Sequence, residues 1–317
     1  MKRDHPKRVI LVANESNWPA FFSLCGVPQR SILGPILFLI YINDFPNSCP
    51  NLQTSLFADD TNISFSHCNY VSLVDKINIG LESITDWTLA NRLTINVSKT
   101  EAMLFSNRNY ESNNAVVSLN SIPIVPSSSC KFLGIIIDNK LTFSGHIDCI
   151  LGRIVRNSKI FFSIKSYLPL RSRLNFYNSL IYPHLAYCII IWGSTWEVHL
   201  KPLIIQQKRF VRMVNDSGPF EHSSPIFFKL RILKLLDIYK FFVLVHMFKS
   251  FNGNFYWVQH SLNTRNRNLA IPKFHRLAQT QHAVSFIGPK LWNEIPLEIR
   301  NVGSLSIFKS KLENYII

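Results

Sequence analysis

Residues 56–65 read LFADDTNISF, two short apolar runs on either side of an aspartate pair, Asp59 and Asp60. Short runs of this kind around turn-forming residues predict a tight β-hairpin. Adjacent carboxylates at such a turn repel each other, and solvent or a divalent cation has to offset that repulsion. Mg²⁺ suits the position because it binds few carboxylates together with waters and phosphate oxygens. Aspartate is also an ordinary turn residue, so an isolated pair would be read as a turn, and the surroundings of this pair decide.

Upstream of the hairpin, residues 26–35 read GVPQRSILGP. Pro35 can open a helix because its missing N–H would be unpaired at the first helical position. The following run, Ile36–Ile42, is apolar on every side, so we expect this helix to be buried in a layered core. Residues 43–46, NDFP, should end it.

Downstream of the hairpin, the spacing predicts a helix over residues 72–90 with a core stripe at Ile77, Leu81, Ile84 and Thr88 or Trp87. The polar stretch 106–128 should be a loop with a weak hairpin at 116–125. Further strands are expected at residues 9–12, 21–24, 93–97, 103–105 and 132–138, with Gly134 as a bulge in the last. From residue 139 onward helical periodicity takes over, with a stripe at Ile147, Leu151 and Ile154. Later helices are expected at residues 170–191, 200–214 and 235–251, and a short apolar-periodic piece at 305–317. The fold class is therefore α+β first and mostly α afterwards.

Composition and charge limit the kind of protein. The chain is 47% hydrophobic and 17% charged, which is typical of a globular protein. Its six cysteines form no C-x2-C or C-x4-C pair, which argues against a zinc site of that kind and favours reduced buried thiols. No apolar run is long enough to cross a bilayer and no signal peptide is recognisable, so we expect an intracellular protein.

The basic residues lie almost entirely in the second part of the chain. Residues 1–105 hold 8 Lys and Arg against 9 Asp and Glu, whereas residues 106–317 hold 26 against 10. Such an excess suits a polyanion, because each phosphate that is neutralised releases counterions. A solvated surface would carry the same charge, so this imbalance alone does not decide for nucleic acid.

The order of the motifs resembles the palm of reverse transcriptases, most closely the jockey-type group of non-LTR (LINE) retrotransposons. The resemblance rests on GVPQ at residues 26–29, FADD at 57–60, LTIN with Lys99-Thr100 at 93–100, FLGI at 132–135 and GPKLWNEIP at 288–296. It implies a C-terminal fragment of such an enzyme: a truncated right-hand palm, an antiparallel sheet with helices, at residues 1–138. A helical thumb would follow at residues 139–252 and a C-terminal tail region at 253–317. The tail's role is not explained by the pattern.

The resemblance also implies roles for individual residues. Asp59 would bind the catalytic Mg²⁺ or Mn²⁺, with Asp60 as the weaker partner, and Lys99 would lie near the triphosphate of the dNTP. The loop with Gly26, Pro28 and Gln29, and the neighbouring Phe57 and Ala58, would form the nucleotide pocket. The RNA template and DNA primer would contact the hairpin containing Phe132, Leu133 and Gly134, and the basic residues Arg153, Arg156 and Lys159.

Two departures from the family pattern bear on activity. The family has a further metal-binding aspartate upstream of the GVPQ loop, and neither Asp4 nor Glu15 lies in an apolar strand that would fit it. Arg30 stands where the family has glycine, and its long side chain should crowd the nucleotide pocket. We therefore expect only a partial metal site and negligible polymerase activity. The alternatives are a non-enzymatic nucleic-acid-binding remnant, and a poorly folded fragment without a molecular role.

Overall fold

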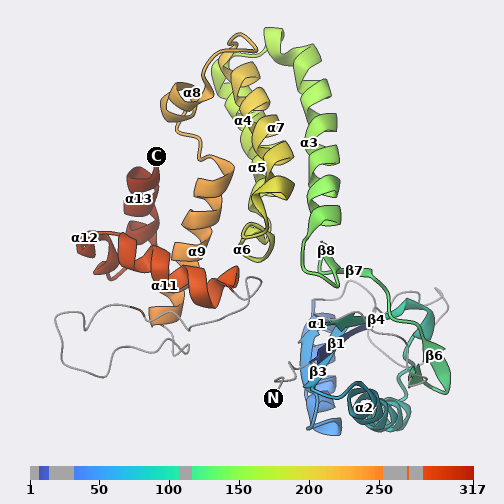
Figure 1. The fold of residues 1–317 in the computed structure, drawn as a ribbon. Helices are drawn as coiled ribbons and strands as arrows, with labels where there is room; N and C mark the ends of the chain where they lie inside the picture. Colours follow the sequence, from blue (N-terminus) through green and yellow to red (C-terminus); the bar gives the residue numbers. More distant parts are fainter. Residues whose placement is uncertain (1–6, 14–31, 107–115, 253–269, 271–280) are drawn as a thin grey trace. The chain divides into compact units, whose positions relative to one another are not determined.

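The computed structural model describes residues 7–13, 32–106, 116–252, 270 and 281–317. The chain divides into two compact units, residues 1–140 and 141–317 (Figure 1). The first combines short antiparallel sheets with helices and the second is helical, so the predicted α+β class is confirmed. No helix among the described residues is long and apolar enough to cross a membrane.

A four-stranded antiparallel sheet organises the first unit. Its strands are β1 (Lys7–Ala13), β2 (Gln53–Phe57), β3 (Asp60–His67) and β4 (Thr100–Phe105), in the spatial order β2-β3-β1-β4. The predicted strands at 9–12 and 103–105 are present, whereas the one expected at 21–24 lies outside the described residues. β1 is an interior strand, paired with β3 on one side and β4 on the other. Its last residue, Ala13, pairs with both Thr61 and Thr100, so β3 and β4 begin at the same end of the sheet.

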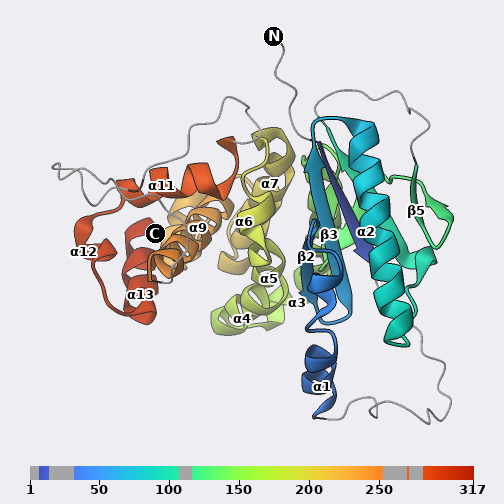
Figure 2. The ribbon, with the colours of Figure 1, turned by 90° about the horizontal axis from the view of Figure 1, so that it is seen from below.

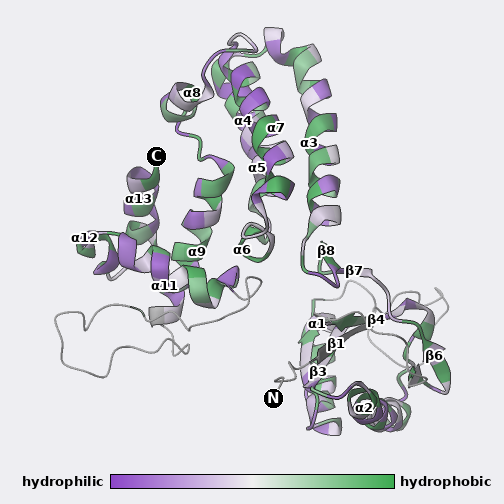
Figure 3. Ribbon diagram, in the orientation of Figure 1, coloured by the Kyte–Doolittle hydropathy of each residue, from purple (hydrophilic) through white to green (hydrophobic). Residues whose placement is uncertain are grey.

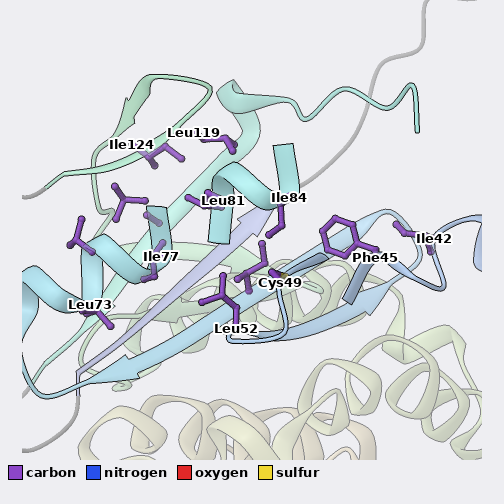
Figure 4. Packing of buried hydrophobic residues seen from close by; sticks show 14 residues of the cluster. Ile42, Phe45, Cys49, Leu52, Leu73, Ile77, Leu81, Ile84, Leu119 and Ile124 are labelled. Atoms are coloured by element: carbon purple, nitrogen blue, oxygen red, sulfur yellow. The ribbon is translucent and has the colours of Figure 1, made fainter. Parts of the chain in front are cut away.

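Helix α2 (Tyr70–Ala90) covers one face of this sheet, running alongside β3 (Figure 2). It begins at Asn69, whose side chain accepts hydrogen bonds from the N–H groups of Val71 and Ser72 at 2.8 and 3.3 Å. This is the usual way to satisfy unpaired donors at a helix start. The predicted core stripe is confirmed: the buried residues are Leu73, Val74, Ile77, Leu81, Ile84 and Thr88. They pack with Ile63, Leu52 and Phe45 into the core of the unit (Figure 4).

Two small hairpins complete the first unit. The hairpin predicted at 116–125 is present as β5 (Val117–Leu119) and β6 (Ile122–Ile124). Asn78 of α2 holds it by donating to the Val116 carbonyl and accepting from the Ser118 N–H, both at 3.0 Å. The strand predicted at 132–138 is wrong: β7 (Ser129–Phe132) and β8 (Ile135–Asp138) form a second hairpin. Leu133 and Gly134 both have positive φ, 45° and 82°, which turns the chain where an extended strand with a bulge was expected.

Helix α1 (Gly34–Tyr41) corrects a second prediction. It begins with Pro35 in its first turn and ends before the short helix η1 (Phe45–Ser48), as expected, but none of its residues is buried. Ile40 is 68% exposed and Leu39 56% exposed. Of its side chains, Phe38 packs against the core, because the helix touches the described part of the unit along only one side. Apolar residues on every side of a helix show that the helix is suited to burial. They do not show that other elements pack over it.

The segment 93–97 corrects a third prediction. It forms no strand: residues 93–96 are not paired in a sheet, and the 3₁₀ helix η2 (Val97–Lys99) follows. Ile95 and Val97 do pack against the core from one side. The alternating apolar residues are therefore explained by their partial burial, and no pairing with another strand is involved.

The second unit is built on helices α3 (Ser144–Ile164), α4 (Leu170–Leu180) and α7 (Glu197–Asn215), joined in part by the 3₁₀ helix η3 (Lys165–Tyr167). Hydrophobic and hydrophilic residues alternate along each of them (Figure 3). Their buried sides meet at Phe161, Phe176 and Phe210, whose rings lie 4.7–6.1 Å apart. The stripe expected on α3 is mostly confirmed, with Ile147 and Ile154 buried and Leu151 half-buried.

The single helix predicted at 170–191 is wrong. The chain forms three helices there, α4, α5 (Tyr182–Ala186) and α6 (Ile189–Trp192). Pro183 has no N–H and is tolerated in the first turn of a helix, so α5 begins anew beside it. Cys188, with a φ of 49°, turns the chain once more before α6. The five cysteines in the described ranges are free thiols.

The C-terminal part of the second unit packs on helix α9 (Leu235–Asn252), which confirms the helix predicted at 235–251. Helices α8 (Ser223–Lys229), α11 (Val284–Glu294) and α12 (Leu297–Arg300) had not been predicted, and α13 (Leu305–Ile316) matches the expected final piece. Phe308 stacks on Phe248 at 4.4 Å between ring centroids and lies 5.9 Å from Trp292. Helices α11 and α13 therefore contribute to the core of this unit.

Candidate functional site

The aspartate pair lies at the apex of the predicted hairpin. Phe57 pairs with Asp60 across β2 and β3, which leaves Ala58 and Asp59 as the two turn residues. Ala58 has a φ of 52°, a conformation that is uncommon for a residue with a side chain. Such strain is often found where a turn has to aim a neighbouring group. Asp59 is exposed at the apex, and Asp60, as the first residue of β3, is half-buried.

The two carboxylates have different surroundings. Asp59 lines a pocket whose other polar members are Thr61, Thr88, Asn96 and Thr100. The remaining walls are apolar and come from α1, η1, α2, β3, β5 and the segment 93–95; they are Phe38, Ile42, Phe45, Ile63, Leu81, Ile84, Trp87, Leu93, Ile95 and Leu119. Asp60 is not among the residues that line this pocket, so the two carboxylates differ in their immediate neighbours.

Electrostatics at the apex favours a positive partner. Desolvation raises the pKa of the Asp60 carboxyl, and repulsion from the Asp59 carboxylate raises it further. Both effects disfavour the second negative charge, and a divalent cation would reverse them by stabilising the ionised form. Two adjacent oxygen donors on a solvent-accessible turn fit a hard cation that keeps several of its waters. No group of three or more His, Cys, Asp or Glu side chains gathers within the described ranges.

Lys99 lies at the same end of the sheet as the aspartates. It is the last residue of η2 and directly precedes Thr100, the first residue of β4. Because Ala13 pairs with Thr61 and with Thr100, the starts of β3 and β4 are separated by one strand, or about 10 Å. The Thr100 hydroxyl donates to the Asn96 carbonyl at 2.9 Å, which fixes the chain between η2 and β4. Asn96 and Thr100 were not predicted as site residues, although their place beside Lys99 could have suggested them.

The other residues singled out from the sequence are spread over the chain. Gly26, Pro28, Gln29 and Arg30 lie outside the described residues, while Phe57 and Ala58 are exposed beside the aspartates. Phe132, Leu133 and Gly134 form the tip of the β7–β8 hairpin, so the hairpin that the resemblance implies is present. β7 packs beside β4, where Cys130 and Met103 form a small core with Phe105, Phe132 and Ile137. Arg153, Arg156 and Lys159 lie in the second unit as exposed residues of α3.

Comparison with known proteins adds an independent line of support. Residues 4–137 match the family "Reverse transcriptase (RNA-dependent DNA polymerase)". The chain is 27% identical over 220 residues to the "Probable RNA-directed DNA polymerase from transposon X-element" of Drosophila melanogaster, covering 67% of this chain and 24% of that protein. It is 28% identical over 223 residues to the "RNA-directed DNA polymerase from mobile element jockey" of the same species, with the same two coverages. No solved structure matches the chain.

These matches define the class of protein first: residues 4–137 form a reverse transcriptase domain. The similarity to the relatives from X-element and jockey supports the non-LTR (LINE) group of reverse transcriptases that the motifs predicted. The chain spans about a quarter of the length of the curated relatives that it matches.

Proposed function

We propose that the chain provides the palm and thumb of an RNA-directed DNA polymerase that transfers nucleotides from dNTPs to a primer 3′-hydroxyl. The single observation that carries this proposal is the Asp59-Asp60 pair at the strained apex of the β2–β3 hairpin, in a reverse transcriptase domain. Lys99 supports it, because it comes to the same end of the sheet.

In this proposal the hairpin apex is the metal-binding part of the polymerase site. Asp59 and Asp60 would hold Mg²⁺ or Mn²⁺, Asp59 as the stronger ligand because it is the more exposed of the two. Such ions activate the attacking hydroxyl and stabilise the departing oxygen in phosphoryl transfer. Lys99 would place its ammonium group near the triphosphate and supply a proton to the leaving pyrophosphate. Phe57 and Ala58, which are exposed beside the aspartates, would help to form the nucleotide pocket.

The remaining contacts follow from the same assignment. Gly26, Pro28 and Gln29 would line the pocket for the template base and the incoming nucleotide. Residues 1–138 would form the palm, residues 139–252 the thumb and residues 253–317 a C-terminal region, of which α11 and α13 pack on α9. Phe132, Leu133 and Gly134 would contact the primer end, while Arg153, Arg156 and Lys159 bind the backbone of the template–primer duplex without reading sequence.

We further propose that this chain on its own has little polymerase activity. The hairpin offers two neighbouring carboxylates, whereas a two-metal centre also draws ligands from a facing strand. The strands next to β3 in this sheet are β2 and β1, whose sequences QTSLF and KRVILVA contain no acidic residue. Loss of part of the metal site would remove both positioning and charge stabilisation in the transition state.

A second candidate function is nucleic-acid binding without catalysis. The observation that favours it is the basic excess of residues 106–317 together with the exposed cations of α3. This function would need no metal, and it would survive the loss of Asp59.

Manganese binding and primer extension test the proposal together. We expect Mn²⁺ to bind the wild-type chain, detected by electron paramagnetic resonance, and the Asp59→Asn variant to bind it more weakly. Asp86→Asn, which removes an exposed carboxylate of α2, is the matched control and should leave Mn²⁺ binding unchanged. Primer extension on an RNA template should be barely detectable in all three. Equal Mn²⁺ binding by wild type and Asp59→Asn would overturn the metal assignment, and robust Asp59-dependent synthesis would overturn the proposed inactivity.

A further inference from the structure

One end of the helical unit carries three exposed aromatic side chains that the polymerase assignment does not use. Phe220 is 96% exposed, Tyr167 86% and Phe162 65%. The ends of α3 and α7 and the start of α4 come together here (Figure 1). Large aromatic rings left in water gain nothing for folding, so a group of them points to a binding surface.

Two contacts show that these residues lie near one another. Lys165 of η3 forms an ion pair with Asp216, just beyond α7, at 2.6 Å between Nζ and Oδ1. The same ammonium group lies 5.9 Å from the centre of the Phe162 ring. Tyr167 follows Lys165 by two residues, so their Cα atoms are at most about 7 Å apart. Phe220 follows Asp216 by four residues, so their Cα atoms are at most about 14 Å apart.

The turn that presents Phe220 is held in place. The Glu221 N–H donates to the Gly218 carbonyl at 3.2 Å, which closes a turn with Phe220 at its tip. The Nε group of Arg212 donates to the Glu221 carbonyl at 2.6 Å and ties the turn to α7. A ring on a fixed turn loses little conformational freedom when a ligand stacks on it.

The charge around the rings is positive. Residues 159–173 and 212–221 together contain five basic residues, Lys159, Lys165, Arg171, Arg173 and Arg212, against two acidic ones, Asp216 and Glu221. Lys159, Phe162 and Lys165 recur every three residues, so they follow one side of α3 into η3. Aromatic rings alternating with cations are the combination that binds single-stranded nucleic acid, with bases stacked on the rings and phosphates near the cations.

We propose that Tyr167, Phe220 and Phe162, with Arg171 and its basic neighbours, form a binding site for single-stranded RNA or DNA. The site is separate from the duplex contacts proposed for Arg153 and Arg156, and it extends the proposed function to an unpaired strand.

Fluorescence anisotropy with a labelled oligouridylate of about 12 nucleotides tests the site in the full chain. We expect Tyr167→Ala and Phe220→Ala each to raise the Kd about fivefold or more without changing its salt dependence, because the rings carry no charge. Arg171→Ala should lower the slope of log K against log salt by about 0.7. Tyr315→Ala and Lys309→Ala remove an exposed ring and cation of α13 and should leave the Kd unchanged.

Two further measurements separate base stacking on these rings from a loss of duplex binding and from misfolding. An RNA–DNA duplex should bind Tyr167→Ala and wild type equally. The effect of the ring variants on oligouridylate binding can therefore be judged even if the proposed duplex contacts or the proposed Mn²⁺ site prove wrong. Thermal unfolding should show that the variants fold like the wild type. An unchanged Kd for oligouridylate in both ring variants would overturn the proposal. Ring-dependent binding to phosphatidylserine vesicles, with RNA binding unaffected, would overturn it in favour of a membrane surface.

Discussion

The side-chain amide of Asn293 pairs with both main-chain polar groups of Ala270. Its Nδ2 donates to the Ala270 carbonyl at 2.9 Å, and the Ala270 N–H donates to its Oδ1 at 3.0 Å. Ala270 is only 2% exposed, so these bonds satisfy a buried peptide group as a neighbouring strand would. Trp292, the residue before Asn293, is buried and packs near Phe308. Trp292 and Asn293 therefore stabilise the C-terminal part of the fold, a role that the sequence pattern alone did not explain.

Replacing Asn293 with alanine should destabilise the chain. Both polar groups of Ala270 would lose their partners in a buried place, at a cost of about 1–3 kcal/mol. Urea unfolding followed by circular dichroism measures the change. Asn301→Ala, which alters an exposed residue after α12, is the control and should change the free energy of unfolding by less than about 0.5 kcal/mol. Equal stability of Asn293→Ala and Asn301→Ala would contradict the assigned role.

Gly288 should not tolerate a side chain, although it lies in a helix where alanine is normally preferred. A Cβ at this position would lie 2.7 Å from the Sδ of Met247, a fully buried residue of α9. Gly288→Ala should therefore cost about 1–3 kcal/mol as α11 and α9 are pushed apart. Gly152→Ala in α3 is the matched change, because nothing lies within 4 Å of its Cβ, and it should stabilise by about 0.5–1 kcal/mol. Thermal unfolding of both variants checks that their changes in stability have opposite signs. A stabilised Gly288→Ala would count against the packing of α11 on α9.

Local features of the fold could be predicted from the sequence. The stripe of α2 and the β2–β3 hairpin follow from periodicity and turn residues within short windows, and both are present. Helices α7 and α9 were also predicted, and both are present over four turns or more. These elements depend mainly on their own residues.

Features that depend on distant partners could not be predicted. Nothing local in the sequence of β1 says that it lies between β3 and β4 rather than at an edge. The exposure of Ile40 depends on which elements cover α1, and the unpaired course of residues 93–96 depends on whether a neighbouring strand is in reach. The closeness of Lys99 to the aspartate end of the sheet also follows from the strand order. Asp59, Asp60 and Lys99 could be singled out in the sequence, but their arrangement, and the place of Asn96 and Thr100 beside them, could not.

Duplex binding should depend on the exposed cations of α3. The double variant Arg153→Ala/Arg156→Ala is expected to weaken binding to an RNA–DNA duplex and to lower the slope of log K against log salt by about 2. Both residues are exposed, so stability should change little. A filter-binding titration at several salt concentrations measures the slope. Lys309→Ala/Lys311→Ala removes the same charge from α13, and a loss of slope as large as in the α3 variant would show that net charge alone is responsible.

The titration of Asp60 offers a test of the metal site that needs no catalysis. Its pKa is raised, mainly by desolvation and in part by Asp59, so the folded state holds this proton more tightly than the unfolded state. The contribution of Asp60 to stability should therefore fall as pH rises through its raised pKa. Carboxyl ¹³C shifts followed against pH should show that Asp59→Asn lowers this pKa only in part, because desolvation remains. Saturating Mg²⁺ should lower it in the wild type, whereas Asp75→Asn, which removes an exposed carboxylate of α2, should not affect it. If Mg²⁺ leaves the Asp60 titration unchanged, these carboxylates do not bind the ion, and the hairpin apex is an ordinary turn.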